Sequence, residues 1–291
     1  MNHKNLIGTA VAAALLFGAQ AVSACAISAW SSATGLTVAD TGEPTAGFSR
    51  YSGKCSLRVP NSNAGAGRFV TDTTPNNETS YRVRFYYYTG DISGVTDIFQ
   101  ARSTGGSNII RVTHDGNQLS FTTFNNGSAT TAQNLTVADN RYYSIQLNWS
   151  AAAGTGALTG TVTGNSGANA TANVVGTINF PNLSNAADSI TEARLGMIAG
   201  TPTVTSPVYF DEFDSRRTQS PGLLCRGDAG GGTGGAPDTV IGVADRVLIT
   251  NEILGTGTQP LGQPDVNDDG IVAPADRVGV TNLILAAASC N

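Results

Sequence analysis

An internal repeat near the end of the chain constrains its fold most strongly. Residues 244–254 and residues 275–285 are identical at eight of eleven positions, at an offset of 31. Self-similarity at such a period indicates two copies of one supersecondary unit that stack on each other. Each copy is expected to form a helix, because its apolar residues recur at helical spacing. The positions that mark this spacing in the first copy are Val247, Leu248, Asn251 and Leu254.

An oxygen-rich loop precedes the second predicted helix. Side-chain oxygens fall at its first, third and fifth positions, a glycine follows, and a carboxylate closes the loop at the twelfth position. This is the spacing of an EF-hand calcium loop. The expected ligands are Asp265, Asn267, Asp269 and Asp276 through their side chains and Ile271 through its carbonyl. The competing interpretation is a solvated turn that only caps the helix.

The first copy of the repeat departs from this pattern. Relative to Asp245 it keeps Asp238 at the fifth position, but Thr239 stands where glycine is expected. Asp228 can serve as the first ligand only if about six extra residues, rich in Gly and Thr, are looped out. A second calcium site made of Asp228, Asp238 and Asp245 therefore depends on that conformation.

The duplicated loop and helix resemble the dockerin family, with a type I-like pattern, over roughly residues 227–291. The resemblance implies a small calcium-folded module of secreted bacterial proteins, which docks onto cohesin domains and often assembles polysaccharide-degrading complexes. Both copies lack the Ser/Thr pair that many such modules place before the closing Asp. Val243-Ala244 and Pro274-Ala275 stand there instead. The partner is therefore a cohesin-like domain, or else the helices pair with each other or with the rest of the chain.

The negative charge of the chain is concentrated in this module. Residues 226–291 hold eight acidic residues and three arginines, net −5, whereas residues 25–225 hold thirteen acidic and twelve basic residues, net −1. A bound dication would offset the excess. The acidic balance, with a pI of about 4.9, and the lack of a basic cluster disfavour nucleic-acid binding.

Residues 1–24 are expected to be a secretory signal. Lys4 precedes an apolar run over residues 6–17, and Val22-Ser23-Ala24 supplies a cleavage site. The run is too short for a transmembrane helix, and no other stretch approaches the required length. The protein is therefore expected to be secreted or on the cell surface. An alternative is a lipoprotein, because Val22 to Cys25 resembles a bacterial lipobox.

Four cysteines follow in the exported chain, where the compartment favours disulfides. Three pairings are possible. Nearness in sequence favours Cys25–Cys55 and Cys225–Cys290, and the second bridge would clip the two ends of the helical module together.

Residues 25–218 are predicted to form a mainly β, antiparallel, jelly-roll-like sandwich. Residues 81–87 alternate, with Tyr81, Val83, Phe85 and Tyr87 on the core face. Asp115-Gly116 between two alternating runs predicts a hairpin, and turn signals recur at intervals typical of sandwiches. The layout resembles concanavalin-like or laminin-G-like jelly rolls in strand count, in length and in its closing strand, which contains Tyr-Phe-Asp-Glu-Phe.

Residues 219–237 are rich in glycine and are expected to form a flexible linker to the calcium module at residues 238–291. Tyr86 and Tyr88 are expected on the face opposite the core. They form a platform for a sugar or pack under a loop.

Catalytic signals in the sandwich are sparse. His114 is the only histidine after the signal, which excludes a three-histidine zinc site, and its position in a turn predicts a solvated ring. Glu212 and Asp214 are expected on one side of the last strand. They are candidates for a glycosidase acid pair, or a strand-end cluster paired with Arg216 and Arg217.

These features predict a secreted bacterial protein. Its sandwich recognises a glycan or a surface, and its calcium-binding dockerin-like module docks a protein partner, in connection with polysaccharide binding or breakdown. One alternative is a glycoside hydrolase, acting on O-glycosyl bonds, that carries a dockerin. A second alternative is a structural cell-surface protein.

Overall fold

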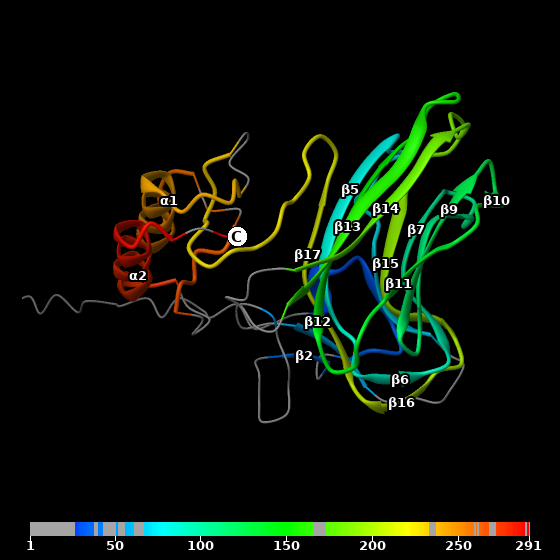
Figure 1. Cartoon of the computed structure of the whole chain (residues 1–291), viewed down its shortest axis with the longest axis horizontal. Helices are drawn as coiled ribbons and strands as arrows, with labels where there is room; N and C mark the ends of the chain where they lie inside the picture. The colour runs from blue at the N-terminus through cyan, green and yellow to red at the C-terminus, as the bar shows by residue number, and fades with distance from the viewer. Residues whose placement is uncertain are drawn as a thin grey trace, which may run out of the picture.

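The computed structural model describes residues 27–37, 40–42, 51, 56–60, 67–165, 173–232, 237–258, 260, 262–267, 272–288 and 290. The predicted signal segment, both cysteines of the predicted Cys25–Cys55 bridge, and the predicted ligands Asp269 and Ile271 lie outside these residues. Figure 1 shows a two-sheet sandwich with a pair of helices beside it. Within the described part, no helix is both long and apolar enough to cross a membrane.

The first sheet has eight strands, in the order β1-β4-β15-β7-β8-β9-β10, with β11 also paired to β9. Its strands are β1 (Ser32–Thr34), β4 (Arg68–Asp72), β15 (Glu192–Gly200), β7 (Val95–Arg102), β8 (Asn108–Asp115), β9 (Gln118–Asn125), β10 (Ser128–Ala129) and β11 (Gln133–Thr136). A short 3-10 turn, η1 (Ile27–Ala29), precedes β1.

The second sheet has seven strands, in the order β14-β13-β12-β5-β17-β3-β2. Its strands are β14 (Asn173–Leu183), β13 (Gly156–Asn165), β12 (Tyr142–Ser150), β5 (Ser80–Tyr88), β17 (Val208–Arg216), β3 (Ser56–Val59) and β2 (Thr41–Gly42). A separate pair joins β6 (Asp91–Ser93) to β16 (Thr203–Ser206). All these strands pair antiparallel, so the predicted antiparallel two-sheet architecture is confirmed.

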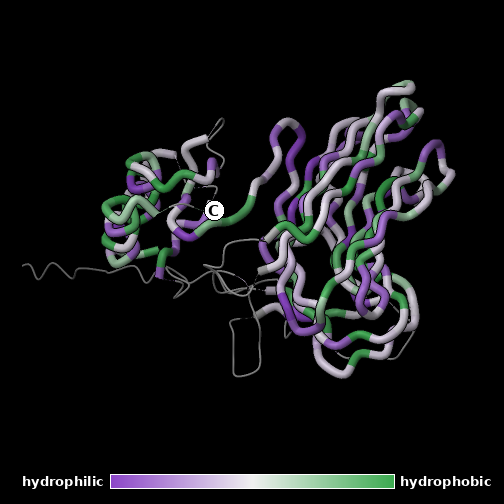
Figure 2. Tube along the Cα trace, in the orientation of Figure 1, coloured by the Kyte–Doolittle hydropathy of each residue, from purple (hydrophilic) through white to green (hydrophobic). Residues whose placement is uncertain are grey.

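The core lies between the sheets and follows the alternation of the strands. Tyr81, Val83, Phe85 and Tyr87 of β5 are all fully buried, as predicted. Phe85 meets Phe99 of the opposite sheet with 5.2 Å between ring centroids. Hydrophobic and hydrophilic residues alternate along the sandwich strands in Figure 2, as two-faced sheets require.

The hairpin predicted at Asp115-Gly116 joins β8 to β9, with Asp115 opposite Gln118. Gly116 adopts the left-handed conformation that such a turn needs, at φ 57°. The prediction of a solvated His114 is wrong. Its side chain is fully buried, and its Nδ1 lies 2.8 Å from the Tyr87 hydroxyl, because β8 turns this residue toward the core.

The repeated segments form two helices, α1 (Val243–Leu254) and α2 (Pro274–Leu285), as predicted. They pack on each other around Ile249 and Val280, which are equivalent in the repeat and are both fully buried. Val247 and Leu254, which marked the expected helical spacing, are instead 52% and 66% exposed. A two-helix module buries only one stripe of each helix, and that stripe is the one that carries Ile249.

The first part of the predicted linker is held against the second sheet. We call residues 218–224 the strap. Arg84 on β5 donates from Nη1 to the Gly222 carbonyl at 3.0 Å, and the Leu224 amide donates to the Tyr86 hydroxyl at 2.9 Å. Arg82 donates to the Thr218 carbonyl, and Ser220 bonds to Asn148 of β12. The strap therefore runs across the outer face of β5 before the helical module begins.

Candidate functional site

Asp276 sits in the first turn of α2, and its carboxylate is fully buried. One oxygen accepts hydrogen bonds from the amides of Val266 at 2.8 Å and Asn267 at 3.1 Å. The other accepts from the amide of Ala273 at 2.8 Å. Asp276 thus joins the start of the predicted calcium loop to the start of the helix.

Asp245 makes the same three contacts in the first copy. One oxygen accepts from the amides of Ala229 at 2.8 Å and Gly230 at 3.0 Å, and the other from Gly242 at 2.7 Å. Matching these donors to those around Asp276 places Asp228 in the position of Asp265. The first loop is therefore six residues longer than the second between this aspartate and the aspartate in the first turn of the helix.

The two loops lie side by side. The Gly227 amide donates to the Gln263 carbonyl at 3.1 Å, and the Gln263 amide donates to the Asp228 carbonyl at 2.8 Å. Gly262 allows this approach, since a Cβ there would stand 2.1 Å from the Asp228 carbonyl oxygen. The repeat thus brings Asp228 and Asp265 into one paired structure.

Asp228 carries unusual electrostatics. Its side chain is fully buried, and it accepts hydrogen bonds from the amides of Asp238 at 3.3 Å and Thr239 at 2.7 Å. Burial is the largest cause that raises the pKa of Asp228, and together with the charges of Asp245 and Asp238, and against the two hydrogen bonds, it brings that pKa to about 6. Burial likewise raises the pKa of Asp245. Among the residues that the structure describes, the carboxylates of Asp228 and Asp245 accept hydrogen bonds from backbone amides and form no ion pair with a basic residue.

The donor set fits calcium in its chemistry, because carboxylate and amide oxygens are the hard ligands that this cation prefers. The geometry of the described side chains does not by itself indicate a metal site. Among the residues that the structure describes, no three carboxylate, histidine or cysteine side chains converge as a metal site. Asp245 and Asp276 instead hold backbone amides, so the helix-capping interpretation is also satisfied.

A disulfide joins Cys225 to Cys290 across 65 residues, in the pairing predicted for this module. Both cysteines pack against the small core around Ile241, Ile249 and Val280. The bridge closes the module at its two ends.

Glu212 and Asp214 do not form an alternating pair. A register shift between Asp211 and Asp214 interrupts the pairing of β17 with β5, and Glu212 takes a left-handed φ of 50°. Asp214 forms an ion pair with Arg216 at 2.8 Å, whereas Arg217 pairs with Glu78 at 2.9 Å. Burial raises the pKa of Glu212, although the charge of Arg84 opposes this. A β-bulge, which alternation alone does not reveal, separates the two candidates.

Tyr86 and Tyr88 have different surroundings on the outer face of the second sheet. Tyr86 is fully buried beneath Tyr51, with which it stacks at 3.7 Å, and beside Leu224 of the strap. This is the packing alternative that the sequence left open. Tyr88 is partly exposed and lies between Tyr142 and Tyr209, at 5.1 and 5.8 Å between ring centroids.

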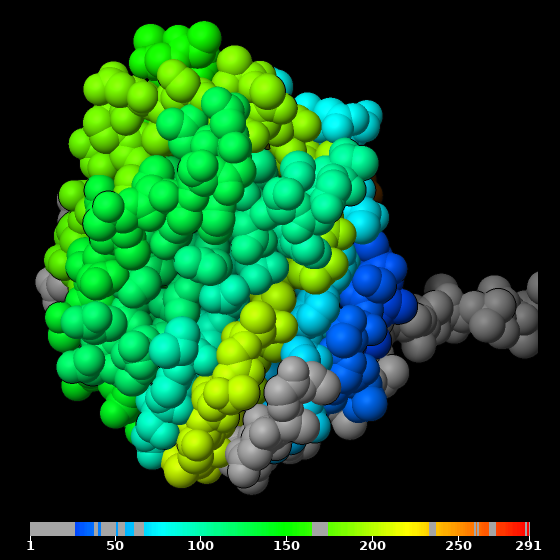
Figure 3. All heavy atoms as spheres, turned by 90° about the vertical axis from the view of Figure 1, so that its right-hand side faces the viewer, coloured from blue at the N-terminus to red at the C-terminus, as the bar shows by residue number. Residues whose placement is uncertain are grey.

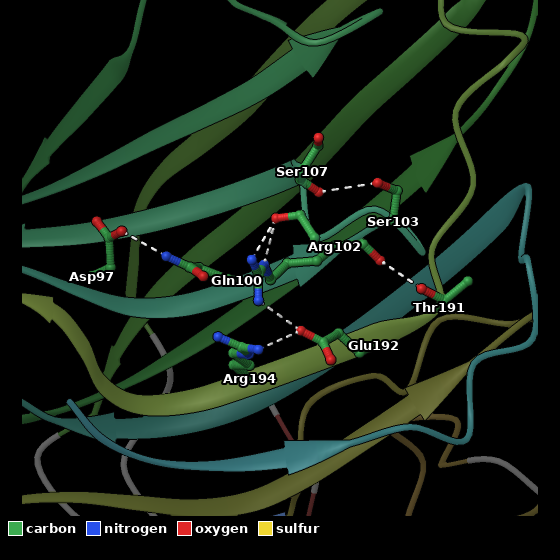
Figure 4. A network of polar contacts seen from close by, with 9 residues as sticks. Asp97, Gln100, Arg102, Ser103, Ser107, Thr191, Glu192 and Arg194 are labelled. Atoms are coloured by element: carbon green, nitrogen blue, oxygen red, sulfur yellow. Dashed lines mark hydrogen bonds and ion pairs between the residues drawn. The ribbon is translucent and has the colours of Figure 1, made fainter. Parts of the chain in front are cut away.

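The outer face of the first sheet carries a network of polar side chains (Figure 4). Arg102 and Arg194 both contact Glu192 Oε1 at 2.9 Å. Gln100 donates to Asp97 at 2.7 Å in the same network. Each of these charged groups already has a partner within the sheet, so the network stabilises strand pairing.

Comparison with known proteins gives distant structural likenesses. The receptor binding domain of botulinum neurotoxin type G has a TM-score of 0.40 and 12% identity, over 62% of this chain and 43% of that one, so the chain spans less than half of its length. The marine PL-14 alginate lyase from Aplysia kurodai has a TM-score of 0.41 and 11% identity, over 62% and 88%. The cellulose induced protein Cip1 has a TM-score of 0.40 and 15% identity, over 62% and 88%.

No protein-family model and no curated protein matches the sequence. The structural likenesses concern the sandwich and carry no inference about ligand or activity. The dockerin resemblance remains a prediction from the repeat.

Proposed function

We propose that this is a secreted protein in which a calcium-stabilised docking module, residues 225–290, carries a β-sandwich that recognises a glycan or surface ligand. The observation that carries the proposal is the repeat of one carboxylate arrangement, with Asp228 and Asp245 in the first copy and Asp265 and Asp276 in the second. Asp228 and Asp245 are buried carboxylates that form no ion pair with the described residues; burying such a charge is costly, and a bound cation would reduce that cost.

Exposed apolar side chains support the docking role. Val247 and Leu254 on α1 are 52% and 66% exposed, and their equivalents Val278 and Leu285 on α2 are 61% and 80% exposed. Exposed apolar groups that gather on one small module are typical of protein interaction surfaces. The duplicated stripes suit a cohesin-like partner domain with an apolar face.

Calcium titration of the full chain tests the metal proposal. We expect calorimetric binding of Ca²⁺ and a rise in the melting temperature of the helical signal, because calcium binds the folded state selectively. Asp265→Ala and Asp276→Ala are expected to weaken binding by about tenfold or more, whereas Asp139→Asn, an exposed residue of the sandwich, should not. Equal binding by all four proteins would defeat the site assignment.

The docking proposal predicts calcium-dependent binding to recombinant cohesin-like domains. Val278→Glu together with Leu285→Glu places charges on the exposed stripe of α2 and is expected to weaken binding about tenfold, while Val174→Glu, which is 63% exposed on the sandwich, should leave it unchanged. Tight binding that ignores both calcium and these substitutions would contradict the proposal.

A glycan array, combined with a reducing-sugar assay, tests the sandwich. Binding without release of product is expected. Release of reducing ends by the full chain would replace the recognition role with that of a hydrolase acting on O-glycosyl bonds. Absence of both would favour a structural protein.

A further inference from the structure

A cavity of about 420 Å³ opens between the two sheets, at one edge of the sandwich. The segment of η1 and β1 forms one side of it, beside the end of β4, and residues 213–215 of β17 form the other. Figure 3 shows the N-terminal segment, in blue, along this edge of the molecule. The volume falls in the range of roughly 300–1,000 Å³ that is usual for small-ligand sites.

The bulge in β17 shapes this cavity. The left-handed conformation of Glu212 breaks the alternation of the strand, so that Phe213 turns toward the interior of the sandwich. Phe213 then meets Trp30, with 5.0 Å between the ring centroids and 53° between the planes. Strained residues and bulges of this kind occur preferentially next to functional sites. One wall of the cavity is therefore aromatic.

The lining of the cavity also includes two carboxylates with different partners. Asp214 is neutralised by Arg216 at 2.8 Å. Asp72 is 9% exposed and accepts a hydrogen bond from the amide of Thr74 at 2.9 Å. Since the described residues give Asp72 no ion pair, the cavity carries one uncompensated negative charge and several hydrogen-bond acceptors.

A buried hydroxyl beside the cavity lacks a partner. Tyr81 is fully buried, and its hydroxyl has no hydrogen bond among the described residues, since Ser215 lies beside it at a geometry that falls short of one. Burial raises the pKa of Tyr81, and the charges of Asp72 and Asp214 act in the same direction, whereas Ser215 and Arg217 lower it. Orphaned buried hydroxyls call for an explanation, and a bound ligand or water is one.

We infer that this cavity binds one pyranose unit of a neutral glycan. The ring of Trp30 suits the apolar C–H face of a sugar, and the carboxylates of Asp72 and Asp214 accept hydrogen bonds from its hydroxyl groups. The negative charge of Asp72 disfavours uronate and sulfated sugars. An ammonium ligand would use the acids and the aromatic wall, but would leave the hydroxyls of Ser31, Thr74 and Ser215 without a complementary acceptor.

The inference rests on the proposed glycan-recognition role and adds to it a location and a class of sugar. It can be tested by tryptophan fluorescence, because the chain has only two tryptophans and Trp149 is 1% exposed in the core. Acrylamide quenching of the full chain therefore reports mainly on Trp30. The probes are cellotetraose, xylotetraose and mannotetraose, with tetragalacturonate as the acidic counterpart and tetramethylammonium as the cation.

We expect at least one neutral tetrasaccharide to protect Trp30 from quenching and tetragalacturonate not to do so. By calorimetry, Trp30→Ala and Asp72→Asn should weaken that binding by about tenfold or more, whereas Asp139→Asn should not. Melting curves identify a variant that fails to fold. Asp72→Asn keeps the shape of its side chain and remains a test if Trp30→Ala does not fold.

The outcomes separate this inference from the proposed function. Glycan binding that is unchanged in Trp30→Ala and Asp72→Asn but lost in Tyr88→Ala would move the site to the outer tyrosines. It would overturn the cavity assignment while leaving glycan recognition intact. If only tetramethylammonium or only tetragalacturonate protects Trp30 from quenching, the assignment of a neutral sugar as the ligand would be overturned. Lack of binding to every sugar of an array would overturn both proposals.

Discussion

His114 makes the stability of the sandwich depend on pH. Burial lowers its pKa from 6.5, although the backbone at Gly116 and the charges of Asp139 and Asp115 oppose this. The unfolded chain therefore binds a proton at a higher pH than the folded chain does. Stability is full above pH ~6.5 and falls as the pH drops below that value.

We expect the free energy of unfolding in urea to fall between pH 7 and pH 5, by about 1.4 kcal/mol for each unit by which the pKa is lowered. His114→Gln should remove part of this slope, even if it lowers stability at every pH because the side chain is buried. Parallel pH profiles for the variant and the wild type would show that another group is responsible.

Gly262 tests the pairing of the two loops that precede α1 and α2. An added Cβ would stand 2.1 Å from the Asp228 carbonyl oxygen and 3.0 Å from the carbonyl carbon of Ala229, so backbone must move. Gly262→Ala is expected to destabilise the helical module by about 1–3 kcal/mol. The matched control is Gly105→Ala, because a Cβ there meets nothing within 4 Å. The helical signal at 222 nm during thermal unfolding measures the difference, and equal melting of the two variants would contradict the loop pairing.

At the level of elements, local patterns predicted more than long-range contacts did. Alternation in β5 identified its buried face, and the repeat located α1 and α2, since both signals lie in neighbouring residues. The bulge at Glu212 escaped prediction because a register shift depends on what β5 and Trp30 require of β17. The prediction of Glu212 and Asp214 on one side of the strand assumed an alternation that the bulge interrupts. Phe213 packs against Trp30 at this place instead.

The strap was equally hidden in the sequence. Its glycine and proline content is typical of a flexible connection, but the β5 residues that hold it, Arg84 and Tyr86, lie more than 130 positions earlier. The same contacts explain the burial of Tyr86. Tyr88, which is partly exposed, lies two residues further along β5 and beyond the strap.

For the whole molecule, the disulfide determines how independently the helical module unfolds. Cys225 and Cys290 lie 65 positions apart in the sequence, and the module that they close has a core of only a few buried side chains. Replacing both cysteines by serine is expected to destabilise the module by about 2–5 kcal/mol. The sandwich should keep its own melting temperature. Calorimetry that shows a single transition shifted as a unit would instead mean that the two parts unfold together.

The strap has a mechanical consequence. If a partner docks on the helical module as proposed, a pull on that module would enter the strap at Cys225 and reach β5 through the hydrogen bonds of Leu224 and Gly222. The tension is therefore applied directly to β5, a central strand of the second sheet, because no flexible segment separates the strap from it. Under load, the hydrogen bonds between the strap and β5 would break before either folded part unfolds. Tyr86 would then lose its contact with Leu224 and become more exposed.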